Sequence, residues 1–170
     1  MVKIIGIDPG LAATGVGIVR GLGPRIDSYS FGSIHTSQNT SLPGRLDKIF
    51  SKLLQLLKSE NPDLMVIEDV FSLNRYPKSG IILGQVTGVI QLAGFHASVP
   101  AIEVPVREAK QILTGNGNAD KKQLEKAVRH RLNHKLPIKP VHASDAMGLA
   151  LIGLYRYQDK VGANPKKNLE

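Results

Sequence analysis

The 170-residue chain predicts one layered α/β domain with a mixed five-stranded sheet flanked by helices. Three strand-like runs separated by Gly- and Pro-containing turns open the chain, which is typical of an antiparallel meander. Helical periodicity then alternates with two short apolar runs, which is typical of parallel strands reached by crossovers. The length suits a single well-filled core.

The first half of the chain supplies four of the expected strands. We expect strands over 3–8, 14–20 and 25–34, then a helix capped by Ser41 and ended by Asn61-Pro62. Apolar residues recur along this helix at helical spacing, at Leu46, Ile49, Phe50, Leu53, Leu54 and Leu57. The apolar run 64–67 follows it and predicts a buried parallel strand that ends at Glu68.

The second half predicts one more strand and four helices. A glycine-bearing helix over 79–97 leads to a strand over 101–104, and further helices are expected over 105–114, 119–133 and 143–157. We assign residues 1–158 to a single domain and residues 159–170 to a flexible C-terminal tail, because the latter are polar.

Composition limits the kinds of binding partner and of metal ligand that this chain can have. A formal net charge of +8 favours a polyanion, with nucleic acid as the leading candidate. The chain has no cysteine, so a thiolate nucleophile and thiolate metal ligands are excluded and any metal must be held by oxygen or imidazole. No apolar run approaches a membrane span and no signal-like segment opens the chain, so a cytoplasmic location is expected.

Two apolar strands each end in an acid, Asp8 and Glu68. The carboxyl ends of parallel strands meet at one edge of a sheet, where α/β proteins place their sites. Two neighbouring carboxylates repel each other, so one must be protonated or a cation must lie between them. Taken singly, Asp8 is equally consistent with a turn residue, and Glu68 with a solvated acid at a strand end.

The stretch "VHASDAMGLAL" adds a third acid and an imidazole. His142 at the entrance of the last helix and Asp145 in its first turn project from one face. The helix dipole alone can account for Asp145, and an isolated His is usually an ordinary surface residue. Together with Asp8 and Glu68, however, the four side chains form an oxygen-rich set that suits Mg²⁺ or Mn²⁺.

Several segments in order resemble the RuvC family of bacterial Holliday-junction resolvases: "GIDPGLAATGVGIV", "VIEDVF", "GQVTGVI", "VREAKQILTGNGNADKKQL" and "HASDAMGLAL". The resemblance implies an RNase H-like fold and a homodimeric, metal-dependent endonuclease of DNA recombination and repair. Such an enzyme makes paired symmetric nicks in four-way junctions, leaves 5′-phosphate ends and works with the RuvA-RuvB branch-migration complex.

The same resemblance places the acidic cluster on Asp8, Glu68 and Asp145, and His142 stands where many members carry a further aspartate. It implies two Mg²⁺ ions, replaceable by Mn²⁺, about 3.5 to 4 Å apart. In this hypothesis Asp8 bridges both ions, Glu68 and Asp145 each help to hold one, and His142 ligates or orients the attacking water.

Basic and aromatic residues are candidate DNA contacts. Lys121 and Lys122 lie in the first turn of a predicted helix, where the helix dipole disfavours cations. A bound phosphate at this helix end would explain why two lysines stand there. Solvated lysines remain the alternative. The resemblance adds the positions Arg107 and Lys110, together with a loop containing Phe71, Arg75 and Lys78.

Other functions share parts of this pattern. In sugar kinases and actin-like ATPases the phosphate-binding hairpin also follows a strand that ends in Asp-x-Gly. Such proteins need a second domain, however, which 170 residues are not expected to supply. A YqgF-type RNA-processing nuclease of the same fold is the nearer alternative, and a non-enzymatic DNA-binding module is the third.

For a dimer, the helix over 79–97 is a candidate interface, although burial in the core explains its apolar surface equally well.

Overall fold

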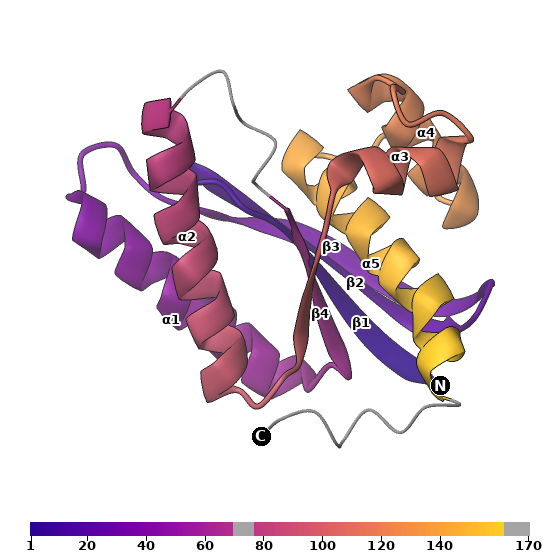
Figure 1. Ribbon diagram of the computed structural model, residues 1–170, viewed down its shortest axis with the longest axis horizontal. Coiled ribbons are helices and arrows are strands. Elements are labelled where there is room, and N and C mark those ends of the chain that lie inside the picture. Colours follow the sequence, from indigo (N-terminus) through magenta and orange to yellow (C-terminus); the bar gives the residue numbers. More distant parts are fainter. Residues whose placement is uncertain (70–76, 162–170) are drawn as a thin grey trace.

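The computed structural model describes residues 1–69 and 77–161 and shows a five-stranded sheet between two layers of helices (Figure 1). The strands are β1 (Val2–Asp8), β2 (Ala13–Leu22), β3 (Arg25–His35), β4 (Leu64–Glu68) and β5 (Ala101–Val104). The helices are α1 (Leu42–Glu60), α2 (Pro77–His96), α3 (Val106–Thr114), α4 (Lys121–Arg131) and α5 (Val141–Val161).

The sheet has the order β3-β2-β1-β4-β5 and is mixed, as predicted. β1, β2 and β3 form an antiparallel meander, whereas β4 pairs parallel with both β1 and β5. Two crossovers through α1 and α2 make this possible. β1 and β4 therefore end side by side at the same edge of the sheet.

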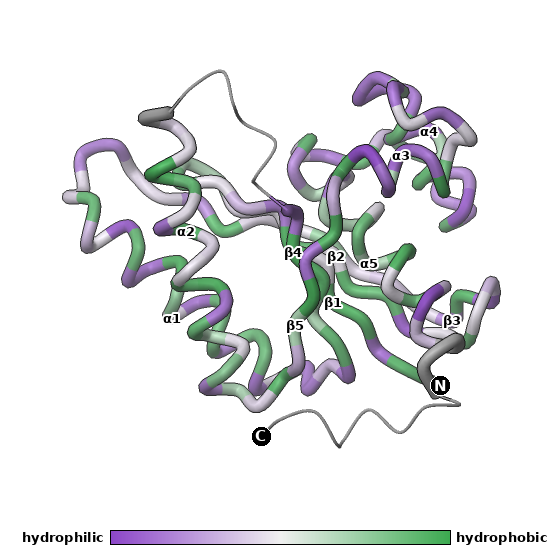
Figure 2. Tube along the Cα trace, viewed as in Figure 1, coloured by the Kyte–Doolittle hydropathy of each residue, from purple (hydrophilic) through white to green (hydrophobic). Residues whose placement is uncertain are grey.

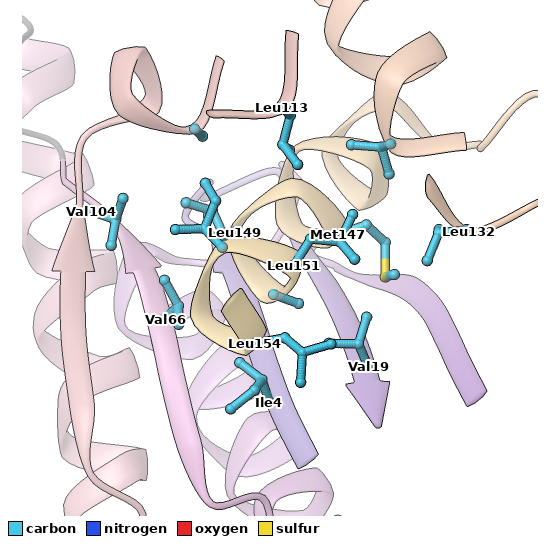
Figure 3. Close-up of a cluster of buried hydrophobic side chains, with 14 of the residues drawn as sticks. Ile4, Val19, Val66, Val104, Leu113, Leu132, Met147, Leu149, Leu151 and Leu154 are labelled. Carbon is cyan, nitrogen blue, oxygen red and sulfur yellow. The ribbon is translucent and has the colours of Figure 1, made fainter. Parts of the chain in front are cut away.

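Each face of the sheet carries its own apolar core. Side chains from β1 and β4 pack against α1 and α2 on one face, and alternate side chains of the same strands pack against α3, α4 and α5 on the other. Ile4 and Val66 belong to the second core, which also contains Leu151 and Leu154 of α5 (Figure 3). The hydrophobic colouring accordingly runs through the central strands, α2 and α5, while α4 is largely hydrophilic (Figure 2).

Glycines let α5 lie directly against the backbones of β1 and β2. A Cβ on Gly6 would lie 2.1 Å from the carbonyl oxygen of Ala146, and one on Gly15 would lie 2.0 Å from that of His142. A Cβ on Gly17, which pairs with Gly6 across the two strands, would lie 2.7 Å from Met147 Cα. Any larger residue at these three positions would therefore push α5 away from the sheet.

The ends of several elements differ from the prediction. Ser41 occupies the N-cap of α1 but makes no side-chain capping bond, so its predicted capping role is wrong. α4 begins two residues later than predicted, because Asp120 caps it with a capping box to Gln123. α5 runs from Val141 to Val161, so it includes His142 and three residues assigned to the tail. Residues 162–170 lie outside the described part, and the division into domain and tail stays a prediction.

No helix within the described ranges has the length and apolar character needed to cross a membrane.

We expect Gly6→Ala to lower the free energy of unfolding by about 3 kcal/mol, because the added methyl group meets backbone atoms of α5 that cannot turn aside. The matched control is Gly32→Ala on β3, where a Cβ would meet nothing within 4 Å. Chemical denaturation of both variants measures the difference. Equal stability of the two variants would show that α5 does not need this close approach.

Candidate active site

Asp8 and Glu68 end the two adjacent parallel strands β1 and β4. The register pairs Ile7 with Ile67, which sets the next residue of each strand, Asp8 and Glu68, beside each other. Their side chains are joined by a hydrogen bond. Asp8 is only 6 % exposed, so the contact between the two carboxyl groups is largely withdrawn from water. The predicted convergence of these two acids is confirmed by the geometry.

His142 reaches the same point from the first turn of α5. Its Nδ1 lies 2.6 Å from Asp8 Oδ2, across the close contact that Gly15 permits between β2 and α5. With Asp8 ionised, the Nδ1–H group of His142 donates to the carboxylate. The sequence paired His142 with Asp145 on one helix face and did not reveal its bond to Asp8.

Asp145 completes the acidic group from the next position on this face of α5. It is buried, and its charge contributes to raising the pKa of both Asp8 and Glu68. Asp145 Oδ2 lies 3.3 Å from Nζ of Lys121, the first residue of α4. The ammonium group of Lys121 therefore partly neutralises the cluster. The sequence singled out Lys121 but pointed to a phosphate, not to this carboxylate, as its partner.

Burial governs the protonation of the two strand-end acids. It raises the pKa of Asp8 to about 6 and, with the hydrogen bond to Asp8 and the charges of Asp8 and Asp145, raises the pKa of Glu68 to about 8. Lys121 opposes both shifts. At neutral pH the two carboxyl groups therefore share one proton in their hydrogen bond. The repulsion between the two groups is relieved by one proton.

The donor set suits a hard divalent cation. Three carboxyl groups and one imidazole offer the oxygen and nitrogen ligands that Mg²⁺ and Mn²⁺ accept. Within residues 1–69 and 77–161, no three such side chains are already spaced to hold one ion together. The carboxyl groups instead bond to each other, to His142 and to Lys121. A cation would take over the role that the Glu68 proton and the Lys121 ammonium play here.

The predicted DNA contacts fall into three groups. Lys121 lies at the acidic cluster, and Lys122 is exposed beside it on α4. On α3, Arg107 is exposed and Lys110 is half-buried. The remaining candidates are not covered by the structure: Phe71 and Arg75 lie outside the described residues, as does the side chain of Lys78.

In the metal-free protein we expect the free energy of unfolding to fall as the pH rises from about 5 to about 8. Folding raises the pKa of both Asp8 and Glu68, so the native state holds more protons than the unfolded chain in this interval. Stability is therefore lost as the pH increases. Chemical denaturation across the interval measures the slope. Glu68→Gln should flatten it, whereas Asp47→Asn on the exposed side of α1 should not. A stability that rises over the same interval would contradict the assignment.

Comparison with known proteins agrees with the geometry. The family model "Crossover junction endodeoxyribonuclease RuvC" matches residues 4–153. RuvC of Prosthecochloris aestuarii is 35 % identical over 164 residues, covering 96 % of this chain and 86 % of the relative. RuvC of Vibrio campbellii is 40 % identical over 149 residues, covering 87 % of this chain and 84 % of the relative.

Solved structures show the same fold, which is RNase H-like. The structure of T. thermophilus RuvC in complex with a Holliday junction substrate superimposes with a TM-score of 0.87 at 27 % identity, covering 94 % of this chain and 96 % of that one. The yeast mitochondrial Holliday junction resolvase Ydc2, at 10 % identity and a TM-score of 0.62, shares the fold. These matches do not favour the RNA-processing alternative. The chain belongs to the RuvC family of crossover junction endodeoxyribonucleases.

Proposed function

We propose that this chain resolves Holliday junctions by cutting two strands at symmetric positions, leaving 5′-phosphate ends in recombination and repair. The observation that carries the proposal is the convergence of Asp8, Glu68 and Asp145, from three separate elements, in a chain of the RuvC family. A purely structural role does not account for two buried acids and a partly buried third in mutual contact or electrostatic range, because their repulsion destabilises the fold.

The RuvC family is a family of metal-dependent nucleases, and we assign the metal here as two Mg²⁺ ions, with Mn²⁺ as a substitute. Asp8, Glu68 and Asp145 would hold the ions, and His142 would be a further ligand or would orient the attacking water. When bound, the ions lower the pKa of water and stabilise the charge on the leaving oxygen.

The chain's own groups prepare this site. Glu68 must lose the proton that it shares with Asp8 before its carboxylate can serve as a ligand. His142 holds Asp8 Oδ2 through Nδ1 and so orients that carboxylate. Lys121 neutralises Asp145 while no other cation is present. The glycines of β1 and β2 keep α5, and with it His142 and Asp145, at the sheet edge.

DNA contacts and cellular partners extend the proposal. We assign Arg75, Lys78, Arg107, Lys110, Lys121 and Lys122 to the DNA backbone, and Phe71 to stacking on an unpaired base near the junction centre. The chain acts in the cytoplasm, and the RuvA-RuvB complex is its branch-migration partner. These assignments rest on the family and on the net charge of +8.

A homodimer would give the two-fold symmetry that paired cuts require. The outer face of α2 supports this assembly. It exposes Ile81, Leu92 and Phe95, the last to 80 %, and its other exposed positions between these residues are glycine, glutamine and isoleucine. A helix face that is apolar and uncharged is unusual next to water, and pairing with a second copy across a two-fold axis would cover it.

Asp8→Asn should reduce junction cleavage about a thousandfold, the equivalent of losing the charge stabilisation that a bound metal supplies, and should leave junction binding intact. Single-turnover cleavage of a mobile four-way junction in Mg²⁺ or Mn²⁺, together with a mobility-shift assay, measures both effects. Asp47→Asn on α1 is the matched control and should cut like the unmodified protein. Cleavage by Asp8→Asn at the control's rate would refute the site.

Phe95→Glu should convert the dimer to a monomer, because it places a charge in the apolar contact. Light scattering after size-exclusion chromatography measures the mass. Leu22→Glu, at an exposed apolar position on β2, is the control and should stay dimeric. A dimeric Phe95→Glu variant would show that another surface forms the dimer.

A further inference from the structure

The positive charge of the chain is concentrated in one short stretch. Residues 121–139 contain seven Lys and Arg residues and one acid, Glu125, so they carry +6 of the total formal net charge of +8. Lys121 is paired with Asp145, and Arg129 is only partly exposed. The other five cations lie on α4 and on the segment that follows it and are exposed; we call them the α4 basic surface: Lys122, Lys126, Arg131, Lys135 and Lys139.

In the described part of the chain, the cations of this surface have no carboxylate partner. Within the described ranges, the ion pairs of this stretch join Arg129 to Glu125, at 3.2 Å, and Lys121 to Asp145. None joins a member of the α4 basic surface to a carboxylate in that part of the chain. Five exposed like charges within a short stretch repel one another, which opposes folding.

Local helix stability does not explain this arrangement. The helix dipole favours a cation in the last turn of α4, which accounts for Arg131. It disfavours Lys122 in the first turn and has little effect on Lys126 in the middle. Lys135 and Lys139 lie beyond the helix altogether. A ligand of opposite charge accounts for all five positions at once.

The segment after α4 is held in place by several contacts. Glu125 accepts a hydrogen bond from the Ile138 backbone N–H at 3.0 Å, and the Tyr29 hydroxyl on β3 lies 2.8 Å from His134 Nδ1. Leu132 and Ile138 are buried in the core beside α5. The backbone that carries Lys135 and Lys139 is therefore fixed before any ligand arrives, which lowers the entropy lost on binding.

The surface is continuous with the active site. α4 begins at Lys121, whose Nζ reaches Asp145, and extends from there over 11 residues (Figure 1). At 1.5 Å per residue this is about 16 Å. Phosphates of one DNA strand follow each other at about 3.4 Å along the helix axis, so the surface spans about five nucleotides.

We propose that the α4 basic surface binds the phosphate backbone of the duplex arm that leaves the active site, beyond the nucleotides next to the cut. This inference rests on the proposed function and extends it, because it continues the backbone contact from Lys122 to four cations farther from the catalytic cluster. The contact is made to phosphates, so it raises affinity for every sequence equally and does not select the cleavage site.

The test compares two triple variants with equal loss of charge. Lys126→Gln, Arg131→Gln and Lys135→Gln remove three cations of the α4 basic surface. Lys48→Gln, Lys52→Gln and Lys58→Gln remove three exposed lysines of α1, on the opposite face of the sheet. Junction affinity is measured by titration over a series of salt concentrations, and backbone contacts by hydroxyl-radical footprinting.

We expect the α4 triple variant to bind at least about tenfold more weakly and to reduce the slope of log affinity against log salt by about 2 to 3. Its footprint should lose protection up to about five nucleotides from the cut. Its single-turnover cleavage at saturating protein should equal that of the unmodified chain. The α1 triple variant should match the unmodified chain in junction affinity, salt slope, footprint and cleavage.

The outcomes separate this inference from the proposed function. If the unmodified chain neither binds nor cuts junctions, the proposed function fails. If it does both, and the α4 variant keeps the salt slope and footprint of the unmodified chain, the inference alone is overturned and an acidic protein becomes the partner of this surface. An equal loss in the α1 and α4 variants would also overturn it, since the effect would then reflect net charge.

Discussion

The direct contact of α5 with the backbones of β1 and β2 is the constraint on which the site depends. Asp8 lies at the end of β1, and the other side chains of the cluster must be brought to it from distant parts of the chain. Glycine at positions 6, 15 and 17 removes the side chains that would separate helix and sheet. His142 and Asp145 consequently reach the edge where β1 and β4 end, and Lys121 follows through its contact with Asp145.

This contact also creates an electrostatic problem. Three acids share a largely buried region, and burial favours the neutral form of each. The protein relieves the repulsion with the proton between Glu68 and Asp8, the imidazole of His142 and the ammonium group of Lys121. A divalent cation can take the place of the proton and of the ammonium group. The same arrangement that weakens the metal-free fold therefore favours metal binding, and the DNA phosphates bring further negative charge to a chain that is otherwise strongly basic.

The sequence predicted the sheet and the convergence of the strand-end acids because both follow from local rules. Turn residues between apolar runs indicated the meander, and an apolar run after a helix indicated a parallel strand beside β1. The bond between His142 and Asp8 joins residues 134 positions apart and depends on how closely α5 approaches β2, which periodicity does not report. The capping roles of Ser41 and Asp120 were likewise decided by side-chain bonds that residue type alone does not settle. The catalytic roles of the four site residues stay predictions.

The central claim is that divalent cations replace the proton that relieves the crowding of Asp8 and Glu68. Calorimetric titration of Mn²⁺ into the metal-free protein near neutral pH, in two buffers of different ionisation enthalpy, counts the protons released on binding. Because burial raises the pKa of Glu68 to about 8, about one proton should leave per chain, and Glu68→Gln should release none. Binding of Mn²⁺ without proton release, or with equal release from the Glu68→Gln variant, would contradict the claim.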